Sequence, residues 1–157
     1  MIKMPARSLV IALLVAGLSF VARSSASAEE MTCPEHTPVS IDIKPGDYPN
    51  KINLSSRGLV PVAVLASQDF DASLFAPEMA RLADANTDMS QGCMGAVAVR
   101  RKLDDVNRDG RVDLVFFFLT QDLNFTPDTT AAMFMAHGAY EGGVSHIMGM
   151  DSVVVKP

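Results

Sequence analysis

Residues 105–119 read DVNRDGRVDLVFFFL, a polar loop that runs directly into an apolar segment. The apolar part, Leu114–Leu119, is uninterrupted and follows a glycine and several charged residues. A short, continuous apolar run bounded by turn-forming residues is typical of a buried strand. We therefore predict that Leu114–Leu119 is the most buried strand of the protein.

Strand signals continue on both sides of this segment. Val39–Ile43 alternates apolar and polar residues, as a half-buried strand does. Leu59–Leu65 is almost continuously apolar, and Pro61 within it favours an edge strand or a bulge. Further apolar runs predict strands at Ala96–Leu103, Ala131–His137 and Ser152–Lys156.

One segment of the chain is a helix candidate. This is Leu74–Asp84, and Pro77 limits any helix there to a couple of turns. Short strands separated by Gly, Pro and Asp are typical of antiparallel sandwiches. The sequence therefore predicts an all-β fold, an Ig-like antiparallel β-sandwich with one short helical turn.

The N-terminus carries the three parts of a secretory signal. Two basic residues precede an apolar run over residues 9–22, and the small residues 24–28 end in an A-x-A pattern. The run has about 14 residues, fewer than the roughly 20 that span a membrane, so a membrane anchor is the weaker alternative. We expect residues 1–28 to be a cleaved signal peptide. Residues 29–157 then form one domain without a membrane span, in the periplasm or secreted.

The charge of this domain limits its partners. The signal contains three basic residues and no acidic ones, so the remainder carries 10 basic and 18 acidic side chains. Because an acidic surface repels phosphate backbones, we expect no nucleic acid partner. The expected partner is an unidentified protein or a component of the cell envelope.

The domain contains two cysteines, Cys33 and Cys93. In an oxidising compartment an even pair usually forms a disulfide. This bridge would close a loop of about 60 residues, for which the chain-entropy model gives about 4 kcal/mol of stabilisation. Two free, reactive thiols are the alternative.

The loop over residues 105–113 has the oxygen spacing of a calcium site. Alternate residues carry side-chain oxygens, and Gly110 follows where the chain must turn sharply. Calcium takes six to eight oxygen ligands, and alternate residues of a tight loop can surround one ion. The predicted ligands are the side chains of Asp105, Asn107, Asp109 and Asp113 and the main-chain carbonyl of Arg111.

This loop departs from the helix–loop–helix calcium site. Phe116 stands where the bidentate glutamate is expected, and a strand follows instead of a helix. At least one ligand must come from water or from elsewhere, with Asp104 adjacent and Asp69 and Asp71 as distant candidates. We therefore expect the weak, sub-millimolar affinity of extracellular modules. An acidic, solvated turn without an ion is the alternative.

Several blocks of the sequence together resemble a module of exported bacterial and archaeal proteins. They follow the pattern IDIKPG…PN.IN…G..PVAIL…FD…DV[ND].DG..DLV.F..QD over residues 39–156. The resemblance implies a module that is often appended to larger extracellular proteins, and it implies no enzymatic activity. It also adds to the calcium prediction, because the acidic loop lies at the matching position. The matching blocks are Ile41–Gly46, Pro49–Asn50, Ile52–Leu54, Gly58, Val60–Leu65, Asp69–Asp71, Asp105–Val115 with Phe118 and Thr120–Asp122, and Gly149 with Asp151–Val153.

Methionine and histidine form a second regular pattern near the C-terminus. If two short segments pair antiparallel with His137 opposite His146, their alternate side chains lie on one face of a hairpin. Thioethers and imidazoles are soft ligands suited to Cu(I), so periplasmic copper binding is the alternative function. The competing explanation is that methionine fills the core, or that Ala132, Phe134 and Ala136 form the core face and leave the methionines outside. The soft-metal candidates are Met133, Met135, His137, His146, Met148 and Met150.

The sequence does not predict an enzyme. It contains neither a G-x-S-x-G nor an H-E-x-x-H motif, and both cysteines are expected to be bridged. With no Trp and only two Tyr, it offers little to stack on a sugar. We predict an exported, non-catalytic calcium-binding module with a binding or structural role at or outside the cell envelope.

Overall fold

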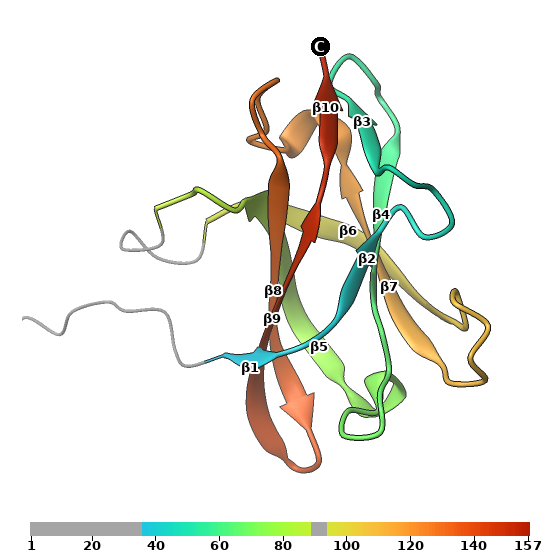
Figure 1. The fold of residues 1–157 in the computed structure, drawn as a ribbon. Helices are drawn as coiled ribbons and strands as arrows, with labels where there is room; N and C mark the ends of the chain where they lie inside the picture. The colour runs from blue at the N-terminus through green and yellow to red at the C-terminus, as the bar shows by residue number, and fades with distance from the viewer. Residues whose placement is uncertain (1–35, 89–93) are drawn as a thin grey trace, which may run out of the picture.

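The computed structural model describes residues 36–88 and 94–157, and their regular structure is almost entirely β-strand (Figure 1). This confirms the predicted all-β class. The short 3-10 turns η1 (Ala72–Leu74) and η3 (Thr120–Asp122) are the helical exceptions in these ranges. Within the same ranges no helix is long and apolar enough to cross a membrane. The strands are β1 (Thr37–Pro38), β2 (Ile41–Ile43), β3 (Lys51–Asn53), β4 (Leu59–Val64), β5 (Ala76–Asp84), β6 (Ala96–Asp104), β7 (Asp113–Leu119), β8 (Ala131–Tyr140), β9 (Gly143–Ser152) and β10 (Val154–Lys156).

Eight of these strands form one curled sheet in the order β1-β9-β8-β5-β6-β7-β4-β2, and β10 pairs with β3. The sheet bends at β6, because Ala96 and Val97 pair with β5 while the rest of β6 pairs with β7. The two halves thus face each other, and Phe134 of β8 packs against Phe116 and Phe118 of β7 at ring-centre distances of 5.1 and 6.3 Å. The Ig-like arrangement of two separate sheets is therefore not confirmed.

The predicted position of the most buried strand is confirmed. β7 lies between β4 and β6, and it has the largest share of buried residues among the described strands. Leu114, Phe116 and Phe118 belong to the single hydrophobic core. On its other face, Phe117 is half-buried beneath the Arg100 guanidinium, 4.3 Å from the ring centre.

The expected short helical turn is present as η1, but most of the helix candidate Leu74–Asp84 is a strand. After the 3-10 turn, residues 76–84 form strand β5, which pairs with β8 along most of its length. Pro77 sits at a register shift, between Pro77 and Met79, where a bulge accommodates a residue without an N–H donor. The local pattern did not indicate this strand, because its partner β8 lies far along the chain.

A close approach at Gly149 closes the curled sheet. The segment from β1 to β2 pairs first with β9 and then with β4, and between them Val39 N–H donates to Met148 O at 2.8 Å. A Cβ at Gly149 would lie 2.5 Å from Ile41 Cγ2 and 2.7 Å from Val39 O. Only glycine leaves room for this segment to cross β9.

We expect Gly149→Ala to lower the free energy of unfolding by about 1–3 kcal/mol, because the added carbon meets main chain and a core side chain. Urea denaturation measures this change. Gly143→Ala is a control in the same strand, since its Cβ would have its nearest neighbour, Tyr140 O, at 3.8 Å. Equal stability of the two variants would contradict the role assigned to Gly149.

Candidate metal sites

The loop between β6 and β7 is wrapped around the Asp105 carboxylate. This carboxylate accepts the N–H of Asp109 at 3.1 Å through Oδ1 and the N–H of Gly110 at 3.0 Å through Oδ2. Arg108 and Gly110 have positive φ angles of 60° and 85°, which provide the sharp turns. Hydrogen bonds from the loop's own backbone therefore hold the first predicted calcium ligand inside the curve of the loop.

Two other predicted ligands meet Asp105 there. Asn107 Oδ1 accepts the same Asp109 N–H at 3.1 Å, and Asn107 Nδ2 donates to Asp109 Oδ2 at 3.2 Å. The N–H of Arg111 donates to Asp109 Oδ1 at 2.8 Å and is the main reason that the pKa of Asp109 lies below its ordinary value. The Arg111 guanidinium adds a contact of 3.6 Å to Asp109 Oδ2. Hydrogen bonds within the loop thus link Asp105, which is half-buried, with Asn107 and Asp109, which are exposed.

The structure places the fourth predicted side chain, Asp113, elsewhere. Asp113 is fully buried at the start of β7. Its Oδ1 accepts the N–H of Ala66 at 2.8 Å, and its Oδ2 accepts the N–H of Val106 at 3.0 Å. This carboxylate anchors the loop to the chain that leaves β4, and it does not join the group formed by the other three side chains.

The additional ligand candidates are Asp104, Asp69 and Asp71. Asp104 and Asp71 have hydrogen-bond partners of their own, and Asp69 and Asp71 line a surface hollow next to the loop. Asp104 pairs with Lys102, whose hydrogen bond and charge lower the pKa of Asp104. Asp71 Oδ1 accepts the N–H and the hydroxyl of Ser73 at 2.9 and 2.6 Å, which lowers its pKa. Asp69 and Asp71 both line a surface hollow that Gly110 and Arg111 of the loop also line, so water in this hollow could connect either carboxylate to the loop.

We expect Asp113→Ala to lower the free energy of unfolding by about 3–5 kcal/mol, because two buried N–H groups lose a charged acceptor. Asp113→Asn keeps one acceptor oxygen and should lose roughly half as much. Urea denaturation of both variants measures the two losses. A change below about 0.5 kcal/mol in Asp113→Ala, the size typical of a surface substitution, would show that the carboxylate is no anchor.

The methionine–histidine hairpin pairs as the sequence predicted. In strands β8 and β9, His137 lies opposite His146, Met135 opposite Met148, and Met133 opposite Met150. A two-residue turn, Glu141-Gly142, joins the strands with positive φ angles of 48° and 83°. This turn matches the right-handed twist of the strands and fixes the register.

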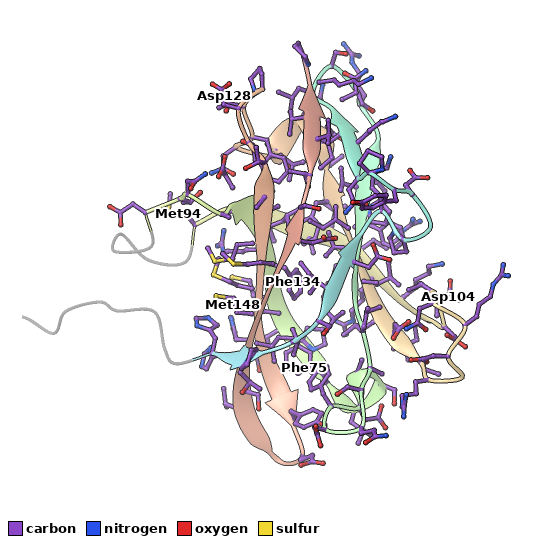
Figure 2. All side chains as sticks on the ribbon, in the orientation of Figure 1. Phe75, Met94, Asp104, Asp128, Phe134 and Met148 are labelled. Atoms are coloured by element: carbon purple, nitrogen blue, oxygen red, sulfur yellow. The ribbon has the colours of Figure 1, made fainter. Side chains whose placement is uncertain are left out.

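The methionines of this hairpin do not belong to the contiguous hydrophobic core, although Met133 and Met135 are buried. Ala132, Phe134 and Ala136 belong to the hydrophobic core, so the alternate side chains point to the outer face of the sheet. Figure 2 shows the sulfur atoms grouped beside Met148 on this side. Met135 is nevertheless only 4% exposed. Thioethers are thus buried on a face of the sheet that is usually polar.

A third histidine joins the hairpin, and sequence reasoning missed it. The ring centre of His146 lies 5.9 Å from that of His137 and 5.9 Å from that of His36, which precedes β1. Burial, followed by the charge of His146, lowers the pKa of His36 below its ordinary value. No local pattern marks His36, because β1 meets β9 only through a pairing across about 110 residues.

Within residues 36–88 and 94–157, no three His, Cys, Asp or Glu side chains come close enough together to form a metal cluster. Both candidate sites therefore need donors of other kinds. In the loop these are the Asn107 amide oxygen and a main-chain carbonyl oxygen, and on the hairpin they are methionine thioethers.

The predicted signal peptide and disulfide, residues 1–28 and Cys33–Cys93, lie outside the described residues. Comparison of the sequence with protein-family models gives no match, and comparison with curated proteins gives none either.

Proposed function

We propose that this chain is an exported, non-catalytic module whose loop at residues 105–111 binds calcium, and that it has a binding or structural role at or outside the cell envelope. One observation carries the proposal. The Asp105 carboxylate is held by two loop N–H groups, and Asn107 and Asp109 meet beside it. Hydrogen bonds therefore link three oxygen-bearing side chains within a single turn.

The chemistry of these donors favours a hard cation. Carboxylate, amide and main-chain carbonyl oxygens are the usual ligands of calcium. The Asp105 and Asp109 carboxylates both accept N–H groups from residues 109–111, so they bring two negative charges to one short segment, and the Arg111 guanidinium contacts only Asp109. With Asp113 directed into the protein, water supplies more of the coordination shell, which agrees with weak affinity.

Calcium bound here would stabilise the central strand. The loop leads into β7, and Asp113 ties it to the chain after β4. An ion that fixes the loop therefore restrains both ends of the connection between β6 and β7. Binding to the folded state alone contributes about 2.7 kcal/mol when free calcium is a hundredfold above Kd.

We expect calcium to raise the melting temperature by several degrees relative to excess chelator, because the ion binds only the folded loop. Differential scanning calorimetry at both conditions measures this increment. Asp109→Asn should abolish most of it, since the variant keeps the acceptor for the Arg111 N–H but loses a charged ligand.

The matched control is Asp128→Ala, which removes a carboxylate on the opposite side of the molecule from Asp104 and the loop (Figure 2). This control should retain the full calcium increment. Calcium and chelator giving the same melting temperature in the unmodified protein would refute the proposal. An increment that persists in Asp109→Asn would place the ion elsewhere.

A further inference from the structure

A single row of potential metal ligands crosses four neighbouring strands. His146 of β9 lies opposite His137 of β8, and His137 lies opposite Met79 of β5. On the other side of β9, His36 extends the parallel pairing of β1 and contacts His146. Side chains that oppose one another across a sheet share a face, so these four side chains lie together on the outer face.

Thioethers form the next row on the same face. Met135 lies opposite Met148, one step along the strands from the histidines. Met135, Met79 and the three histidines line a small pocket of about 30 Å³, together with Arg81 and Ala136. This volume is large enough for one water molecule or one metal ion.

The spacing of the imidazoles suits a shared ion. Two imidazoles that bind one ion at about 2.0 Å per nitrogen have ring centres about 5–6 Å apart. The observed separation is 5.9 Å for both His137–His146 and His36–His146.

We propose that this row, centred on His137, His146 and Met135, is a binding site for Cu(I), with one further donor supplied by His36 or Met79, which line the same pocket. Neutral thioether and imidazole ligands select soft ions. The charged groups at the site are Arg81, which donates to Gly95 O at 3.0 Å, and Glu78, whose Oε2 lies 3.6 Å from His137 Nε2. A nearby guanidinium favours a monovalent ion over a divalent one.

The competing explanation is that these methionines only fill space. Methionine does serve as a flexible filler, and Met133 and Met135 are buried. The core face of β8 is formed by Ala132, Phe134 and Ala136, as the competing explanation has it. His36 and His137 each contact His146, which brings imidazoles as well as thioethers to this face. The site differs from the hairpin ladder predicted from sequence. Met133 and Met150 do not line the pocket, whereas His36 and Met79 do.

The test is an anaerobic titration of the purified protein with Cu(I) against a chromogenic chelator. We expect one ion per chain with a dissociation constant below micromolar. Met135→Leu and His146→Gln should each weaken binding by at least about tenfold. Met150→Leu, a methionine of the same strand that is 57% exposed, should leave the affinity unchanged. X-ray absorption at the copper edge should show both sulfur and nitrogen neighbours.

Binding weaker than micromolar would overturn the proposal. Full affinity in Met135→Leu and His146→Gln would do the same, because the ion would then be held elsewhere, for example by the thiols of Cys33 and Cys93. Circular dichroism checks that each variant is folded. If Met135→Leu is not, the more exposed Met79→Leu replaces it with the same expectation. Asp109→Asn should bind Cu(I) with unchanged affinity, so the copper proposal and the calcium proposal are tested independently.

Discussion

The buried carboxylate of Asp113 is the constraint on which the arrangement of the loop depends. A charged group without solvent contact is stable only when its oxygens are hydrogen-bonded. Here both oxygens accept backbone N–H groups, one from Ala66 after β4 and one from Val106 inside the loop. Asp113 therefore fixes where the loop leaves the core, and the loop's own turn then brings Asp105, Asn107 and Asp109 together.

The parts of the fold that depend on local pattern were predictable. The continuous apolar run at Leu114–Leu119 identified the central strand β7, because burial on both faces leaves no alternation. The helix candidate Leu74–Asp84 is mostly strand β5, which local pattern did not indicate because its partner β8 lies far along the chain. The single curled sheet could not be predicted from the sequence. It arises because β6 changes its pairing partner from β5 to β7, and because Gly149 leaves room for the segment between β1 and β2 to cross β9.

The same distinction separates the predicted parts of the sites from the rest. The spacing of Asp105, Asn107 and Asp109 is local, and the hairpin register follows from a two-residue turn. Asp113 has the right spacing for a ligand, but its role depends on Ala66, 47 residues earlier. His36 and Met79 join the hairpin only through the long-range pairings of β1 and β5.

The central claim, that calcium binds at the Asp105 side of the loop, is tested most directly by nuclear magnetic resonance of the ¹⁵N-labelled protein during a calcium titration. The amide of Gly110 donates to Asp105, so its signal should shift and saturate as the ion binds that carboxylate. The amide of Ala66 donates to Asp113, which is directed away from the ion, so its signal should move little. The account would be contradicted if the Gly110 amide signal did not shift at saturating calcium, or if the Ala66 amide signal shifted more than any other.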